Sequence, residues 1–144
     1  MTERPIPPSA TLESALYAED LLAAETFYSE IIGLSVILRQ PGRHVFFRAG
    51  QSVLLIFNAA ATTQPPTIGQ TLAVPPHGSE GRGHYCFSIP AADIDRWCDH
   101  LQNKGIAIES DIHWPNGARS IYVRDPAGNS VEFADPALWS QGRY

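Results

Sequence analysis

Apolar and polar residues along the first third of the chain follow two different periods, which predict strands and one helix. Residues 12–18, LESALYA, alternate as in a strand. A helix is expected next, from Asp20 as its N-cap to Gly33 at its end, because apolar residues recur there at helical spacing. These apolar positions are Leu21, Ala24, Tyr28 and Ile31. The strands that follow are expected at residues 35–40, 43–49 and 52–58.

The second half of the chain repeats this order after a segment rich in turn-forming residues. Residues 59–83 contain four prolines and four glycines, which predicts a long linker. A strand is expected at residues 83–90, and a helix at residues 91–104 that Gly105 closes. The remaining strand candidates lie at residues 106–114, 118–125 and 129–134.

The two halves also match residue by residue near their ends. Phe46-Phe47-Arg48 corresponds to Tyr122-Val123-Arg124, 76 positions later. After a two-residue insertion the offset becomes 78, and the matching residues are then Gly50, Ser52 and Val53 against Gly128, Ser130 and Val131. An internal repeat of this kind determines the whole fold, so it is considered before any single element.

We therefore expect an α+β fold in which two βαβββ modules in tandem form a cupped, partly closed sheet. Each module is about half a domain and too small to fold well alone, so the chain should form one domain overall. Its expected parts are an N-terminal arm (1–11), a first module (12–58), a linker loop (59–83), a second module (84–138) and a C-terminal tail (139–144).

Composition excludes several classes of function. The 144 residues carry 10 Lys and Arg against 15 Asp and Glu, and this net charge of −5 argues against a nucleic-acid or anionic-membrane surface. No stretch approaches the roughly 20 apolar residues of a membrane span, and residues 1–11 lack the apolar run of a signal peptide. The two cysteines form neither a CxxC pair nor a disulfide framework, so we expect a cytoplasmic protein.

Equivalent strands of the two modules point to a candidate site. A sheet covered by its helix on one face leaves the other face open, and the open faces of two modules form a cleft. The first-strand positions facing it are Glu13 and His84, and the last-strand positions are Leu54 and Glu132. Each polar residue taken singly suits an ordinary solvated strand. Together they suggest a metal site, because a carboxylate between apolar neighbours needs a partner if it is buried.

Three segments resemble the vicinal oxygen chelate superfamily, which includes glyoxalase I, extradiol dioxygenases, fosfomycin resistance enzymes and bleomycin resistance proteins. These segments are LYAEDLLAAETFYSEIIGL (16–34), GRGHYCFSIPAADID (81–95) and SIYVRDPAGNSVEF (120–133). The last, an RDPxGN turn before a strand that carries Glu, is the most specific. The resemblance covers roughly residues 11–138, and it implies a homodimer that binds a small-molecule substrate or drug.

The resemblance also implies a divalent metal held by Glu13, His84 and Glu132. The usual first-strand ligand, His or Gln, falls on Glu13, and both carboxylates become candidate catalytic residues. A further glutamate of glyoxalase I, which binds the metal and takes part in proton transfer, falls on Leu54, and this departure argues against glyoxalase I activity. Extradiol dioxygenases use two histidines and one carboxylate, whereas this chain offers one histidine and two carboxylates.

One histidine and two carboxylates suit Mn, Zn, Ni, Co or Fe(II) without a choice among them. We expect a divalent-metal-dependent enzyme that chelates a small oxygenated or electrophilic molecule through two oxygens and stabilises the resulting oxyanion or enolate. The alternative is a bleomycin-resistance-type protein that sequesters an antibiotic without catalysis. The sequence leaves open whether the three ligands come from one chain or from two.

Four residues are candidates for the substrate pocket. Leu54 and Cys86 are placed there by their strand positions, although Cys86 also suits the place of a small buried apolar residue. Trp114 and Tyr122 are candidates because a cleft needs apolar walls with a few polar tips, although both also suit ordinary core packing.

Other polar segments are expected to be structural. Residues 124–129, RDPAGN, have the composition of a hairpin turn. His77 and Glu80 are expected to be solvated residues of the linker. Cys98 and His100 are expected on the second helix in structural or exposed positions.

Overall fold

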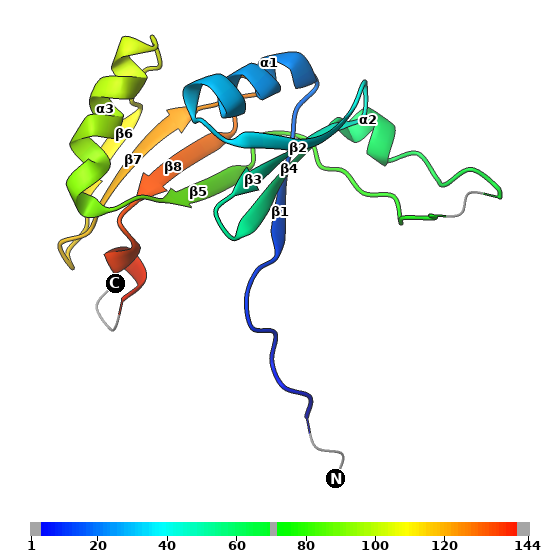
Figure 1. The fold of residues 1–144 in the computed structure, drawn as a ribbon, viewed down its shortest axis with the longest axis horizontal. Helices are drawn as coiled ribbons and strands as arrows, with labels where there is room; N and C mark the ends of the chain where they lie inside the picture. The colour runs from blue at the N-terminus through cyan, green and yellow to red at the C-terminus, as the bar shows by residue number, and fades with distance from the viewer. Residues whose placement is uncertain (1–3, 70–71, 141–144) are drawn as a thin grey trace.

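The computed structural model describes residues 4–69 and 72–140, which form two βαβββ modules in tandem (Figure 1). The first module consists of β1 (Glu13–Tyr17), α1 (Leu21–Thr26), η1 (Phe27–Ile31), β2 (Ser35–Gln40), β3 (His44–Ala49) and β4 (Ser52–Phe57). The second consists of β5 (His84–Ser88), η2 (Ala91–Asp93), α3 (Ile94–Asn103), β6 (Ser110–His113), β7 (Arg119–Arg124) and β8 (Ser130–Ala134). The additional helices are α2 (Ala59–Thr62) and η3 (Pro136–Trp139).

Each module contains a four-stranded mixed sheet with the same topology. The strand orders are β1-β4-β3-β2 and β5-β8-β7-β6. In each module the helix returns the chain so that the second strand runs in the same direction as the first, and two antiparallel turns then make the last strand parallel to the first. The tandem α+β fold is therefore confirmed, and its two sheets remain separate rather than closing into one.

The first helix begins and ends as the sequence predicts but changes its winding midway. The Asp20 side chain caps it by accepting a hydrogen bond from Ala23 N at 2.9 Å, and Gly33 ends it with φ of 90°. From Phe27 the turn widens to a π-helix, in which Ile32 N donates to Phe27 O at 3.0 Å. A single uninterrupted α-helix was the expectation, and the apolar spacing does not reveal this wider turn.

The structure differs from the sequence-based prediction at three other boundaries. Residues 91–93 form a 3₁₀ turn, so that α3 starts only at Ile94. The strand expected from residue 106 starts at Ser110, because Ile106 and Ile108 pack against the core before the strand pairing begins. The linker contains the short helix α2, whose N-terminus the Asn58 side chain caps by accepting from Ala60 N at 3.0 Å.

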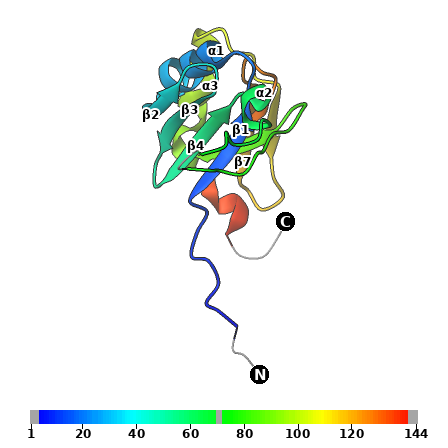
Figure 2. The same ribbon diagram turned by 90° about the vertical axis from the view of Figure 1, so that its right-hand side faces the viewer.

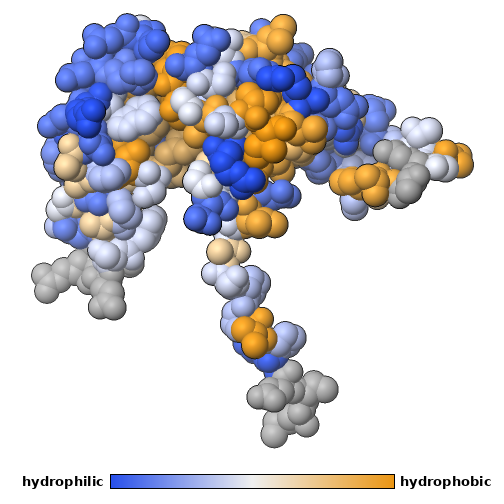
Figure 3. All heavy atoms as spheres, in the orientation of Figure 1, coloured by the Kyte–Doolittle hydropathy of each residue, from blue (hydrophilic) through white to orange (hydrophobic). Residues whose placement is uncertain are grey.

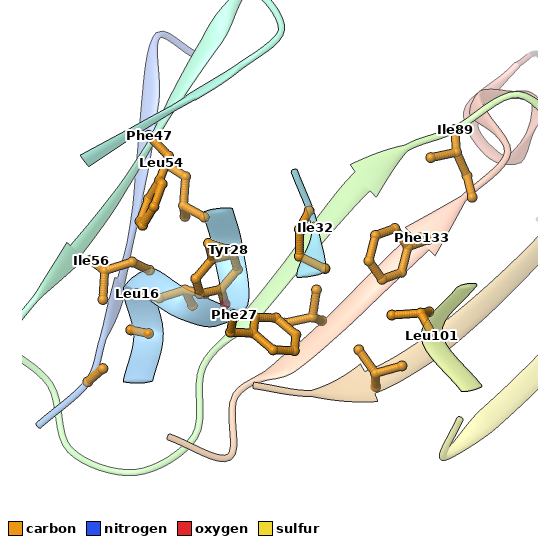
Figure 4. Packing of buried hydrophobic residues seen from close by; sticks show 14 of the residues in the cluster. Leu16, Phe27, Tyr28, Ile32, Phe47, Leu54, Ile56, Ile89, Leu101 and Phe133 are labelled. Carbon is orange, nitrogen blue, oxygen red and sulfur yellow. The ribbon is translucent and has the colours of Figure 1, made fainter. Parts of the chain in front are cut away.

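One hydrophobic core joins the two modules (Figure 4). Tyr28 and Phe47 lie on the first-module side of this core, Phe133 lies on the second-module side, and Ile32 lies between them. In the second module the Trp97 ring stacks on Phe133 with centroids 4.9 Å apart. Because each half-core would be exposed in an isolated module, the two modules depend on each other for burial.

A buried carboxylate forms the polar link between the modules. Asp125, only 5% exposed, accepts hydrogen bonds from the Tyr28 hydroxyl at 2.7 Å and from the Asn129 side-chain amide at 2.9 Å. The same amide donates to Tyr17 O at 3.1 Å, and Asn129 Oδ1 accepts from Gly83 N at 2.7 Å. The RDPAGN segment is thus a turn, as expected, but it also ties η1, β1 and the entry to β5 together.

Two segments extend away from this body. Residues 4–12 are exposed and run outward as an arm (Figures 1 and 2). The linker projects on another side and carries exposed apolar residues (Figure 3), namely Ile68, Leu72 and Val74. None of these residues belongs to the core cluster. Among the described residues, no helix has the length and apolar character needed to cross a membrane.

Tyr28→Phe should lower the free energy of unfolding by about 1.5–3 kcal/mol, the usual contribution of a hydrogen bond to a charged group. The change keeps the ring in the core and removes only the donor to Asp125. Urea denaturation followed by circular dichroism measures the effect. Tyr85→Phe is the matched control, since the hydroxyl of this half-buried tyrosine makes no hydrogen bond among the described residues. Equal losses in both variants would contradict the role given to Asp125.

Candidate functional site

The face of the second sheet that points away from α3 brings together three of the residues singled out from the sequence. Tyr85 and Phe87 pack into the core, so their neighbours His84 and Cys86 lie on the opposite face of β5. The register pairs Cys86 with Glu132 on β8. Residues paired across neighbouring strands share a face, so His84, Cys86 and Glu132 lie together on this open face.

His84 and Glu132 form a directed pair. The distance from His84 Nε2 to Glu132 Oε2 is 3.2 Å, and the distance from His84 Nδ1 to Ser130 O is 3.1 Å. Because a carbonyl oxygen only accepts hydrogen bonds, Nδ1 carries a proton, and the lone pair of the neutral ring is on Nε2. Two acceptors then face each other, which requires either a shared proton or a cation between them. The backbone contact at Nδ1 is the outer contact that metal-binding histidines usually make.

The other oxygen of Glu132 makes no hydrogen bond of good geometry. Glu132 is 5% exposed and its Oε1 atom is buried, while the Cys86 thiol and the Tyr122 hydroxyl lie close enough to the carboxylate to act as donors. Leaving a buried charged acceptor unpaired is costly, so this oxygen is suited to a cation that binds at the open face. The donor set of one imidazole and one carboxylate, oriented in this way, fits a divalent metal.

Two neighbouring groups are held in their neutral forms. Burial and the adjacent Glu132 carboxylate raise the pKa of the Cys86 thiol to about 12. The same two causes raise the pKa of the Tyr122 hydroxyl to about 12, since Tyr122 is paired with Glu132 from the other side on β7. Near neutral pH Glu132 therefore lies between a protonated thiol and a protonated phenol.

A cavity of about 190 Å³ opens beside Glu132. Trp114 and Tyr122, which the sequence suggested as pocket walls, both line it, together with Leu138 and Trp139 from η3. Asn116 holds η3 over the sheet, because its side-chain amide donates to Leu138 O at 3.1 Å. No pattern in the sequence predicts η3, because a four-residue turn after β8 is too short to show a period.

Glu13 lies on the open face of the other sheet and is exposed. Within the described part of one chain, no three His, Cys, Asp or Glu side chains come close enough to hold a metal. The structure therefore brings His84 and Glu132 together and leaves Glu13 apart from them.

The expectation that Leu54 lines the pocket is wrong. Glu13 pairs with Val53, and its equivalent His84 pairs with Ser130, so the last strands are offset by 77 positions instead of the expected 78. A one-residue slip moves a strand residue to the opposite face. Leu54 is fully buried in the core, and its neighbour Leu55, on the open face, is the true counterpart of Glu132.

The open face of the first sheet is aromatic where the second is polar. The His44 ring stacks on Phe46 with centroids 4.1 Å apart, and both of its ring nitrogens are buried without partners. Burial, together with the neighbouring Arg43, lowers the pKa of His44. His77 is not the solvated residue expected from the linker sequence, because its Nδ1 lies 2.8 Å from the Tyr17 hydroxyl and its ring packs edge-on against Phe57.

Comparison with known proteins identifies the architecture. The family model described as "Glyoxalase/Bleomycin resistance protein/Dioxygenase superfamily" matches residues 11–133. The chain belongs to this superfamily. The superfamily generally uses divalent metals, binds small molecules and is often dimeric. The use of metals agrees with the arrangement of His84 and Glu132 on the second sheet.

Individual members of the superfamily support this assignment. The crystal structure of lactoylglutathione lyase from Agrobacterium tumefaciens is similar, with a TM-score of 0.89 and 42% identity over 94% of this chain and 100% of that one. An uncharacterized protein of Pseudomonas aeruginosa, PA2024, is 30% identical over 127 residues, which cover 83% of this chain and 84% of the relative. A glyoxalase/bleomycin resistance protein/dioxygenase from Nocardioides, with a TM-score of 0.67 and 24% identity over 91% of this chain and 85% of that one, shows the fold alone.

Cys86 reports on the charge of Glu132. In a Cys98→Ala background treated with a chelator, Glu132→Gln should accelerate alkylation of Cys86 by iodoacetamide at a fixed pH near 8. Removing the negative charge lowers the thiol pKa, and far below that pKa each unit of lowering gives about ten times more thiolate. Mass spectrometry over time gives the rates. Glu109→Gln, which removes a carboxylate paired with Arg124, should leave the rate unchanged, and no acceleration by Glu132→Gln would contradict the assignment.

Proposed function

We propose that this protein is a divalent-metal-dependent enzyme that acts on a small oxygenated or electrophilic molecule. The single observation that carries the proposal is the buried Glu132 carboxylate, which has one oxygen 3.2 Å from His84 Nε2 and the other without a hydrogen bond of good geometry. Such a carboxylate is stabilised by a bound cation. The ligands in this proposal are His84 and Glu132 of one chain and Glu13 of a second chain.

A second chain is proposed because Glu13 and the pair of His84 and Glu132 lie on the open faces of different sheets. Both helices pack into one shared core, so each sheet buries its helix-facing side and leaves its other face open. Glu13 belongs to one open face, and the pair of His84 and Glu132 belongs to the other. A two-fold dimer presents the same patch from both copies, so it can lay the first sheet of each chain over the second sheet of its partner. That arrangement supplies the third ligand twice and covers both open faces.

The residues of the chain then have distinct roles. A divalent metal held by His84 and Glu132 of one chain and Glu13 of a second chain would supply Lewis-acid stabilisation of the negative charge on two neighbouring substrate oxygens. Glu132 keeps its charge at a fixed place, because it is buried and aligned by His84. Glu13 is the more exposed of the two carboxylates within one chain, so it is the ligand that would release the metal to take a proton from the substrate atom next to those oxygens. Tyr122 stays protonated and donates a hydrogen bond within the cavity.

Leu55 separates this proposal from glyoxalase I chemistry. The corrected register moves the counterpart of Glu132 from Leu54 to Leu55, and both positions are apolar. The additional carboxylate that the sequence resemblance associates with glyoxalase I is therefore missing with either alignment. We propose a site with three protein ligands and a substrate other than that of lactoylglutathione lyase, despite the 42% identity to that neighbour.

The aromatic cavity favours a second candidate function. Bleomycin-resistance-type sequestration requires an apolar wall that holds a drug, and Trp114, Tyr122 and Trp139 supply one. This alternative requires no metal, so metal binding distinguishes the two functions.

The purified protein should bind one divalent metal per chain, and His84→Ala and Glu132→Gln should each abolish most of that binding. The loss should exceed the roughly 10–100-fold decrease that follows removal of an outer partner, because these changes remove ligands. Elemental analysis and titration with Mn(II) or Zn(II) measure it. Glu109→Gln is the control carboxylate variant. Unchanged metal content in both ligand variants would exclude the metal site and favour sequestration.

A heterodimer of Glu13→Gln and Glu132→Gln chains tests whether the site spans two chains. Two affinity tags allow this heterodimer to be isolated from a mixture. If Glu13 acts across the dimer, both changes fall in one site and the other site is intact, so the heterodimer binds about one metal ion while either mutant homodimer binds none. A heterodimer without bound metal would show that no ligand is exchanged between chains.

A further inference from the structure

We propose that the cavity beside Glu132 selects substrates with an uncharged, planar aromatic ring, and that Trp114 and Tyr122 determine this preference. The inference rests on the proposed function for the oxygens that reach the metal, but the ring is recognised by the cavity alone. The described residues that line this cavity all belong to one chain.

The shape and lining of the cavity carry the inference. Its walls are aromatic and aliphatic, from Trp114, Tyr122, Leu138 and Trp139, and Glu132 is the only charged residue among the described residues that line it. A volume of about 190 Å³ is smaller than the roughly 300–1,000 Å³ of sites for drug-sized ligands, so it suits a single small ring system. Flat aromatic walls favour a flat aromatic ligand, since ring pairs gain energy beyond simple burial.

The wall is held in place before any ligand binds. Trp114 Nε1 donates to Ser120 Oγ at 2.8 Å, which fixes the plane of the indole. Asn116 accepts from Ala118 N at 3.0 Å and donates to Leu138 O at 3.1 Å, so the β6–β7 turn and η3 are tied to each other. A pocket that is already ordered loses little conformational entropy on binding, so these contacts favour recognition of a rigid ring.

The charges near the cavity disfavour anionic ligands. The arginines on β7 are already paired, Arg119 with Asp111 at 2.8 Å and Arg124 with Glu109 at 2.9 Å. No Lys or Arg is among the described residues that line the cavity. A divalent cation bound by two carboxylates carries no net charge, so it adds no attraction for a second anionic group on the substrate. A carboxylate on the ring would therefore be buried in the cavity without a partner.

Three ligands with the same chelating group test the proposal on the metal-loaded full chain. They are 2-hydroxyacetophenone, hydroxyacetone, which lacks the ring, and 4-(hydroxyacetyl)benzoate, which carries a carboxylate on the ring. Isothermal titration should show the first binding at least about tenfold more tightly than either of the others. Equal affinity for 2-hydroxyacetophenone and hydroxyacetone, or for the neutral and carboxylated rings, would overturn the proposal.

Substitutions of Trp114 test whether this residue determines the preference for an aromatic ring. Trp114→Leu should bring the affinity ratio of 2-hydroxyacetophenone to hydroxyacetone close to one while leaving metal content unchanged. Trp114→Phe keeps an aromatic ring and should retain most of the ratio, so it supports the assignment even if the leucine variant folds poorly. A ratio that Trp114→Leu leaves intact would contradict the role of this residue.

A further measurement separates this proposal from the metal site. Acetophenone and acetone lack the second oxygen of the chelating pair, and their binding to chelator-treated protein depends on the cavity alone. Tighter binding of acetophenone, by about tenfold, supports the ring preference even if the protein binds no metal. Equal binding of the two overturns the ring preference even if metal content matches the proposed site.

Discussion

The buried carboxylate of Asp125 is the interaction on which the arrangement of both modules depends. It accepts hydrogen bonds from η1 through Tyr28 and from its own turn through Asn129, in a place that excludes water. Asn129 then reaches Tyr17 on β1 and Gly83 before β5. A charge in such a place is tolerated only when it is fully hydrogen-bonded, so the turn can take one position relative to the first module.

The same turn positions the proposed metal-binding pair. β8 starts directly after Asn129, so fixing this residue also fixes where Glu132 lies two residues into the strand. Gly83 is held by Asn129 from one side, and its carbonyl accepts from Ser130 N at 2.9 Å on the other. His84 follows at once and is thereby placed beside Ser130. A Cβ on residue 83 would meet Leu16 Cδ2 at 2.8 Å, so any larger residue there would have to displace this buried leucine side chain. Module packing and site geometry thus depend on one local network.

The sequence was informative where periodicity and chemistry agree, and it failed where only register decides. Alternation in β5 and β8 was enough to put Cys86 and Glu132 on one face, because their apolar neighbours must enter the core. Leu54 and Leu55 are both apolar, so the pattern could not tell which one faces the core. The second module has one inserted residue before its last strand instead of the two expected, and this difference exchanges the faces assigned to Leu54 and Leu55. Short elements such as α2 and η3 make too few turns to show a period, and His77 is placed by a contact distant in sequence.

The bond from His84 to a main-chain carbonyl has a consequence for how this scaffold can diverge. The acceptor at Ser130 belongs to the peptide backbone, so it is present whatever side chain occupies position 130. The tautomer of the histidine is therefore inherited with the path of the strand and does not depend on a second residue being retained. The contact that orients Trp114 runs to the Ser120 side chain instead, so this wall does depend on a second residue being retained. The orientation of the cavity wall therefore changes with either of two side chains, whereas that of His84 persists as long as the strand keeps its path.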